Sequence, residues 1–150
     1  MRVALDTNIL AYAEGIGDTV RQQASLDLIQ ALAPSVVVIP AQCLGELFRV
    51  LTGKTRQDPA SAQKAVQGWA DVYKTADSTW TAFQSAMDAV ANHSLQIWDA
   101  LILAVAAEHR CRLLLSEDMQ HEFSWHGVIV VNPYQKPQHH LLQVLLAGGG

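Results

Sequence analysis

Charged residues are scarce in this sequence, at 16% of 150 residues, whereas half of the residues are hydrophobic. A chain of this length has the usual size of one domain and can bury a sizeable core. The formal net charge of −4 does not favour nucleic-acid binding through bulk electrostatics, so such binding would need a local basic patch or bound cations. Because acids are few, an acid beside an apolar run is more informative here than in a highly charged chain.

Cysteines are also few, and long apolar segments are absent. Cys43 and Cys111 both lie in apolar or helical sequence, which favours buried free thiols over a disulfide. No CxxC motif and no Cys/His pair at zinc spacing occurs. No apolar run reaches the roughly 20 residues that span a bilayer, and Asp6 interrupts the first apolar run too early for a signal peptide. We therefore expect a soluble cytoplasmic protein with no membrane partner.

The first ten residues, MRVALDTNIL, show the pattern around which the chain is organised. Val3–Leu5 is a short apolar run that ends in Asp6, Thr7 and Asn8, after which apolar residues resume. This pattern predicts a buried parallel strand that delivers a carboxylate to the C-terminal edge of a sheet and then turns into a helix. A plain helix cap formed by Asp6 or Asn8 is the alternative interpretation.

The remaining patterns predict helices that alternate with strands. Helical patterns cover residues 19–33, 41–52, 59 to about 73, 79–92 (with Ser78 as the cap) and 97–109. Strand patterns cover residues 35–39, 112–116 and 128–131; residues 72–76 are a further candidate strand, and 141–146 a tail helix or an arm. This order predicts an α/β fold, with a mostly parallel sheet and helices on both faces. We expect one domain over residues 1–147 and a flexible tail over 148–150.

Three further acids lie in places that need an explanation. Glu46 falls on the apolar stripe of its helix, where a carboxylate is costly unless it is paired, hydrogen-bonded or bound to a cation. Asp99 lies in the first turn of a helix that is apolar nearly all round, and Asp118 follows a strand by a few residues. Each acid has a simpler alternative interpretation. Glu46 could lie at the edge of the stripe and reach solvent, and Asp99 could be stabilised only by the helix dipole. Asp118 could be an ordinary loop or capping residue.

One shared explanation covers all four acids. Asp6, Glu46, Asp99 and Asp118 converge on one pocket at the C-terminal edge of the sheet if the two strands are parallel. Like charges that close need compensation, which hard divalent cations with oxygen ligands, Mg²⁺ or Mn²⁺, supply. One or two such ions can activate a water and stabilise the leaving oxygen in phosphodiester cleavage.

Basic and histidine residues give weaker signals. Arg49, Lys54 and Arg56 cluster at the end of the helix that carries Glu46, and they are candidates for contacts with the phosphates of a nucleic-acid substrate. A solvated helix end favoured by the dipole explains them equally well. His121 and His126 bracket a short segment, but they lack the helical spacing of a zinc site.

Taken together, four short motifs resemble those of PIN-domain nucleases, and among them the short bacterial toxins of the VapC type. The motifs are Leu5-Asp-Thr-Asn-Ile9, Gly45-Glu-Leu47, Trp98-Asp-Ala-Leu-Ile102 and Leu115-Ser-Glu-Asp-Met119. None is specific alone, but their order and spacing over essentially the whole chain are. The resemblance implies a three-layer α/β/α sandwich, Mg²⁺- or Mn²⁺-dependent endoribonuclease activity on RNA, a homodimer, and a cognate antitoxin that blocks the site.

The resemblance also implies roles for individual residues. The acidic metal-site positions, which are also the catalytic ones, fall on Asp6, Glu46, Asp99 and Asp118. The polar positions that orient these acids fall on Thr7, Asn8 and Ser116. Many relatives have a neutral residue where Glu117 stands, and the Ser-x-Asp pattern favours Asp118 over Glu117 as the functional acid.

Other functional classes fit less well. A phospho-acceptor domain would need paired acids near the first strand and a lysine after a late one. A haloacid-dehalogenase-type phosphatase would need Asp-x-Asp after the first strand, where Asn8 takes the third position. A nuclease that processes RNA without being a toxin, and a catalytically degenerate binding module, remain the alternatives.

Overall fold

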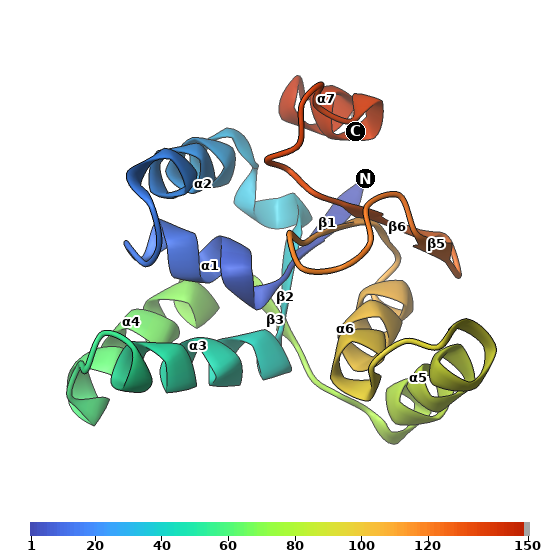
Figure 1. Cartoon of the computed structure of the whole chain (residues 1–150), viewed down its shortest axis with the longest axis horizontal. Coiled ribbons are helices and arrows are strands. Elements are labelled where there is room, and N and C mark those ends of the chain that lie inside the picture. Colours follow the sequence, from blue (N-terminus) through green and yellow to red (C-terminus); the bar gives the residue numbers. More distant parts are fainter. Residues whose placement is uncertain (149–150) are drawn as a thin grey trace.

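A six-stranded sheet lies at the centre of the computed structural model, which describes residues 1–148 (Figure 1). The strand order is β3-β2-β1-β4-β6-β5. The strands are β1 (Arg2–Leu5), β2 (Val37–Pro40), β3 (Lys74–Ala76), β4 (Cys111–Leu115), β5 (Ser124–Trp125) and β6 (Val128–Val131). Strand β1 pairs in parallel with β2 and β4, β2 with β3, and β4 with β6, whereas β5 is antiparallel to β6. The prediction of a mostly parallel sheet is confirmed.

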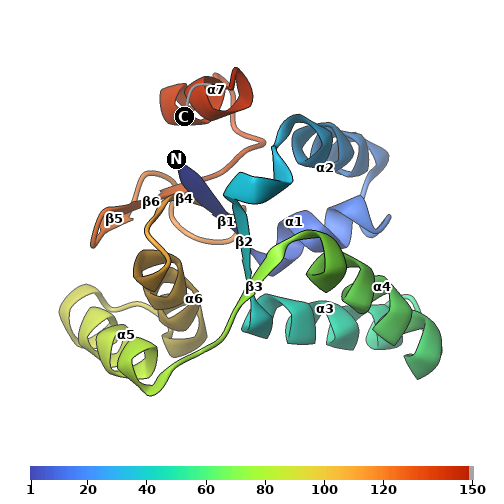
Figure 2. The same cartoon turned by 180° about the vertical axis from the view of Figure 1, so that it is seen from behind.

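Helices cover both faces of this sheet. They are α1 (Thr7–Ala13), α2 (Thr19–Ala31), α3 (Ala41–Gly53), α4 (Pro59–Val72), α5 (Trp80–His93), α6 (Ile97–Glu108) and α7 (His140–Leu146), with a short 3₁₀ helix at Pro34–Val36. Helices α1 to α4 lie on one side of the sheet, and α5 and α6 lie on the other, in both Figure 1 and the reverse view of Figure 2. The three-layer α/β/α arrangement is therefore confirmed.

The buried runs explain why the strands are parallel and central. The strand residues from Val3 to Leu5 and all of β2 are buried, as expected for strands covered on both faces. Helix α6 buries every residue from Ala100 to Ala106 and packs against β2, β4 and β6. Its apolar surface therefore packs on the sheet from one side, and polar groups are confined to its two ends, Asp99 in the first turn and Glu108 in the last.

The register of β1 and β4 decides where the polar residues after them lie. Leu5 lies opposite Leu115, and the backbone N–H of Asp6 donates to the carbonyl oxygen of Leu115 at 3.0 Å. Asp6 and Ser116 therefore leave the sheet side by side at its C-terminal edge.

Several boundaries differ from the sequence prediction. The helix from residue 19 ends at Ala31, because Leu32 is already extended, and the following strand begins at Val37 after the 3₁₀ turn. Helix α5 is capped by Thr79, not Ser78: the Thr79 hydroxyl accepts from the N–H of Ala82 at 3.0 Å. Both residue types are good caps, so sequence alone did not separate them. Strand β5 was not predicted.

The candidate strand at residues 72–76 and the tail segment at residues 141–146 both adopt regular secondary structure. The candidate strand at residues 72–76 is confirmed as β3, and the tail segment forms helix α7. Gly148 lies in a turn, and the rest of the predicted tail, 149–150, lies outside the described residues. The domain boundary at residue 147 stays a prediction. Among the described helices, none is long and apolar enough to cross a bilayer.

Candidate active site

Asp6 is the buried centre of the candidate site. Its side chain is 5% exposed, and it accepts hydrogen bonds from the backbone N–H of Thr7 and from the Ser116 hydroxyl, each at 2.7 Å. The bond from Thr7 makes Asp6 the N-cap of α1. The capping interpretation of Asp6 is therefore correct, and the bond from Ser116 additionally fixes the same carboxylate in a buried position at the edge of the sheet.

Glu46 reaches the same edge from α3. The Thr7 hydroxyl donates to one of its oxygens at 2.8 Å, and the Gln42 amide donates to the other at 3.1 Å. These bonds offset the cost of placing a half-buried carboxylate near the core. Thr7 therefore joins two acids, because its N–H binds Asp6 and its hydroxyl binds Glu46.

Gln42 is a site residue that the sequence analysis missed. Besides binding Glu46, its amide nitrogen donates to the carbonyl oxygen of Trp98 at 3.2 Å, which ties α3 to the first turn of α6. Its amide oxygen is buried and has no hydrogen-bond partner within the described residues. The signal for Gln42 was its place one helical turn before Glu46, where side chains on one helix face meet.

Asn8 links the strand-end acids. Its side-chain amide donates to Asp118 at 3.1 Å and to Asp6 at 3.4 Å, and its oxygen accepts from the backbone N–H of Glu117. Asn8 therefore holds the loop after β4 against the start of α1. Asp118 is exposed and has one carboxylate oxygen on Asn8, so its side chain lies at the rim of the site.

The neighbouring acid Glu117 is occupied elsewhere. Its carboxylate accepts from the Tyr12 hydroxyl and from the Arg21 guanidinium, the latter at 2.5 Å. Burial and the contact with Glu117 raise the pKa of Tyr12 to about 12, so the phenol stays protonated as a donor. Because Glu117 is neutralised by Arg21 on the α1–α2 side, the geometry favours Asp118 as the acid that faces the site.

Asp99 completes the group from the opposite layer. It lies in the first turn of α6, where its backbone N–H is capped by Gln96 at 3.0 Å, and its side chain is half-buried. Burial is the largest cause that raises the pKa of Asp99, followed by the negative charges of Asp118 and Glu46. The charges of these acids are therefore close enough to act on one another.

The same repulsion acts on Asp6. The pKa of Asp6 is raised to about 6, and burial is the largest cause. The hydrogen bonds from Ser116 and Thr7 oppose this rise, whereas the charges of Asp99 and Asp118 add to it. A carboxyl group with this pKa changes its charge near neutral pH. An excess of negative charge around a buried acid is what a bound cation would relieve.

A cavity of about 310 Å³ opens beside these acids. Glu46 and Asp118 line it, and Arg49 and Lys54 add positive charge at the same cavity. Two of the three predicted RNA-contact residues are thus next to the site, whereas Arg56, two residues further, is not among the residues that line it. A cavity with acids and cations together can hold a phosphate beside the carboxylates.

The donor chemistry of the site fits a hard divalent cation. Its ligands would be carboxylate oxygens, the type that Mg²⁺ and Mn²⁺ prefer, and the unpartnered amide oxygen of Gln42 is a further oxygen near Glu46. As placed, no three His, Cys, Asp or Glu side chains within residues 1–148 lie close enough to share one metal ion. The acids at this edge are therefore not arranged as a preformed metal site, and the fit to a cation rests on their donor chemistry.

We predict that Ser116→Ala shifts the titration of Asp6. Ser116 is fully buried and its hydroxyl donates to Asp6, which lowers the pKa of that carboxyl. Without the hydroxyl, the pKa of Asp6 rises above about 6, and stability falls by about 1 kcal/mol. Carbon-13 NMR titration of the Asp6 carboxyl measures the shift. The exposed Ser35→Ala variant is the control, and an unchanged Asp6 titration in Ser116→Ala would contradict the prediction.

Comparison with known proteins agrees with this geometry. The family model of the PIN domain matches residues 3–123. The chain therefore belongs to the PIN-domain family, the nuclease family that its motifs resemble. The comparison with curated proteins gave no match.

Solved structures show the same fold. VapC20 from Mycobacterium tuberculosis, described as a sarcin–ricin loop cleaving toxin, is 21% identical, with 77% of this chain and 91% of that chain covered and a TM-score of 0.65. A toxin–antitoxin complex from Klebsiella pneumoniae is 22% identical (89% and 98% covered, TM-score 0.68). FitAcB from Neisseria gonorrhoeae is 16% identical (88% and 98% covered, TM-score 0.61).

Proposed function

We propose that this protein is a metal-dependent endoribonuclease that hydrolyses RNA phosphodiesters. The observation that carries the proposal is the convergence of Asp6, Glu46, Asp99 and Asp118, from β1, α3, α6 and the loop after β4, at one edge of the sheet. The end of β1, the second turn of α3, the first turn of α6 and the loop after β4 supply these acids from four separate parts of the chain. A purely structural origin would have to place each of them there independently.

In this proposal the four acids bind the cation, and neighbouring polar side chains orient the acids. Asp6, Asp99, Asp118 and Glu46 are the proposed ligands for Mg²⁺ or Mn²⁺, which when bound neutralises charge on the phosphate and lowers the pKa of water. Thr7, Asn8 and Ser116 orient the acids through the hydrogen bonds described above.

Arg49 and Lys54 line the cavity beside the acids, so they are the proposed contacts for phosphates that flank the cleaved bond. Arg56 remains a proposed contact only for RNA that extends beyond this cavity. With this arrangement the phosphate of the cleaved bond would lie near the acids, and the flanking phosphates would contact Arg49 and Lys54.

We further propose that the protein is the toxin of a type II toxin–antitoxin pair and acts in the cytoplasm, as a homodimer that a cognate antitoxin inhibits. Support comes from the structural neighbours, which include a toxin and toxin–antitoxin complexes of the same fold. RNA is the proposed substrate because one of them is described as cleaving the sarcin–ricin loop. An RNA-processing nuclease that is not a toxin uses the same site, and growth arrest on expression of the free protein separates the two.

We predict that purified protein cleaves total cellular RNA with Mg²⁺ or Mn²⁺ and that Asp99→Asn lowers the cleavage rate at least about 100-fold, since a ligand charge is lost from the site. EDTA should abolish cleavage by the parent protein. Asp88→Asn is the matched control, because Asp88 is an exposed acid on α5. Sequencing of the fragment ends identifies the target.

Two results would count against the proposal. Cleavage that persists in EDTA or in Asp99→Asn would place the activity outside the acidic cluster. An absence of cleavage of any RNA pool by folded, metal-loaded protein would favour the binding-module alternative.

A further inference from the structure

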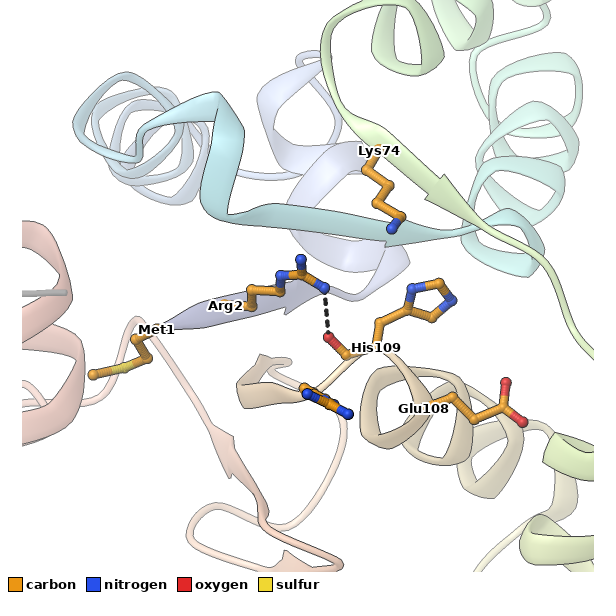
Figure 3. Close-up of a pocket in the computed structure, with 6 residues that line it drawn as sticks. Met1, Arg2, Lys74, Glu108 and His109 are labelled. Atoms are coloured by element: carbon orange, nitrogen blue, oxygen red, sulfur yellow. Dashed lines mark hydrogen bonds between the residues drawn. The ribbon is translucent and has the colours of Figure 1, made fainter.

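A second cavity lies at the opposite edge of the sheet from the acids. It measures about 570 Å³ and is lined by Met1, Arg2, Lys74, Glu108, His109 and Arg110 (Figure 3). These residues come from the starts of β1 and β3 and from the turn between α6 and β4. We call it the basic cavity, because three of the ten Lys and Arg residues of this acidic chain line it.

The cations of the basic cavity come together from distant parts of the sequence. In Figure 3 the side chains of Arg2, Lys74 and His109 point into the same space. Arg2 donates to the carbonyl oxygen of His109 at 3.1 Å. The positive charges of Arg2 and Lys74 also act jointly on the buried Cys111 thiol, lowering its pKa against a larger rise from burial. Both charges therefore lie near the start of β4.

Little in the protein compensates these charges. Within residues 1–148, the Lys74 and Arg110 side chains make no hydrogen bond or salt bridge. Glu108 is the acid at the cavity, but its carboxylate accepts from the Thr79 hydroxyl at 2.7 Å and points away in Figure 3. Of the three cations, only Arg2 donates a hydrogen bond to the C-terminal end of α6, where the helix dipole favours a positive charge. Lys74 and Arg110 need another explanation.

Arg110 also occupies a backbone position that suits glycine. Its φ is +57°, directly after the C-cap of α6, where glycine is the usual residue. An arginine there carries a conformational cost that a glycine would avoid. A charged side chain at this point is consistent with a task for its guanidinium.

The position and size of the basic cavity favour a small anion as its ligand. Its volume lies in the range of small-molecule sites, roughly 300–1,000 Å³. The four residues of β1 separate it from Asp6 by about 13 Å at 3.3 Å per residue, and β1 is a central strand with neighbours on both sides. An RNA strand at the acidic edge would have to pass around the domain to reach it. A small anion fits better than a continuous RNA.

We propose that the basic cavity binds a phosphorylated small molecule with at least two adjacent phosphates, of the size of a nucleoside diphosphate. Arginine binds phosphate oxygens with a planar fork and lysine with a point charge, so Arg110, Arg2 and Lys74 match a pair of phosphates. Met1 adds apolar surface beside them. This site is independent of RNA cleavage, so it stands even if the proposed function fails.

Calorimetric titration tests the proposal with pyrophosphate, ADP, inorganic phosphate and adenosine. EDTA is present throughout, so that no metal at the acidic edge can recruit phosphate. We expect saturable binding of pyrophosphate and ADP, weaker binding of inorganic phosphate and none of adenosine. Lys74→Gln and Arg110→Gly should each weaken ADP binding about tenfold, since each removes a charge-assisted hydrogen bond.

A stability measurement and a matched control variant distinguish a loss of binding from a folding defect. Arg110→Gly suits the positive φ, so its melting temperature should equal or exceed that of the parent. Lys64→Gln is the matched control, because Lys64 is an exposed lysine on α4 that lines neither the basic cavity nor the cavity beside the acids. It should leave ADP binding unchanged.

Several outcomes would overturn the proposal. These are no saturable binding of ADP or pyrophosphate, binding that both cavity variants leave unchanged, and equal binding of adenosine. A short single-stranded RNA that binds more tightly than ADP and loses affinity in the same variants would assign the cavity to RNA, against a small-molecule ligand.

Discussion

Asp6→Asn is expected to abolish RNA cleavage and, in EDTA near pH 7.5, to make the protein more stable than the parent. Burial raises the pKa of Asp6 from 3.8 to about 6, so the folded state favours the protonated carboxyl. The stability that this group contributes is present below pH 3.8 and is lost as the pH rises through about 6. At pH 7.5 the ionised, buried carboxylate costs about 3 kcal/mol relative to the unfolded chain.

Asparagine at position 6 removes the free-energy cost of the buried charge, because it has nearly the same shape as aspartate but is neutral. Its carbonyl oxygen can still accept from the backbone N–H of Thr7, and Ser116 can turn its hydroxyl to accept from the new amide. Differential scanning calorimetry in EDTA should show a higher melting temperature for Asp6→Asn, and the difference should shrink below pH 5. Added Mg²⁺ should stabilise the parent more than the variant, because the proposed ligand charge is gone.

The control for this experiment is Asp88→Asn, an exposed acid on α5. It should change neither the melting temperature in EDTA nor the response to Mg²⁺. If Asp6→Asn were less stable than the parent at every pH, the charge of Asp6 would be favourable in the fold, and the proposed strain at the site would be wrong.

Leu103→Ala is expected to cost about 3 kcal/mol of unfolding free energy, within the usual range for a buried leucine truncated to alanine. Leu103 is fully buried in α6, the helix that packs on three strands and carries Asp99 in its first turn. Loss of its side chain leaves a cavity in the layer that holds one acid against the others. Urea unfolding followed by circular dichroism measures the change.

The matched control is Leu26→Ala, because Leu26 on α2 is exposed. It should change stability by less than about 0.5 kcal/mol. Equal costs for the two leucines would mean that α6 is less tightly packed than its burial indicates. At a urea concentration where Leu103→Ala stays folded, its residual cleavage reports how far the position of Asp99 depends on α6 packing.

The acids were predictable from sequence because they interrupt apolar patterns. Asp6 and Asp118 follow strands, and Glu46 and Asp99 interrupt apolar helices, all of which can be read within about ten residues. Parallel pairing then requires that strand ends meet at one edge. The neighbours of each acid were harder to predict: Gln42 matters because its amide reaches Trp98, 56 residues away along the chain.

Sequence by itself determined the family, the order of helices and strands, and which acids gather, because apolar periodicity and strand-end chemistry are local signals. Tertiary structure alone decided that Glu117 is engaged by Arg21 and Tyr12, 96 and 105 residues away, which supports the choice of Asp118 that the Ser-x-Asp pattern had already favoured. It also decided that Arg2, Lys74 and Arg110 share a cavity. Both depend on strand order and register, which bring distant residues together and leave no trace in any short stretch of sequence.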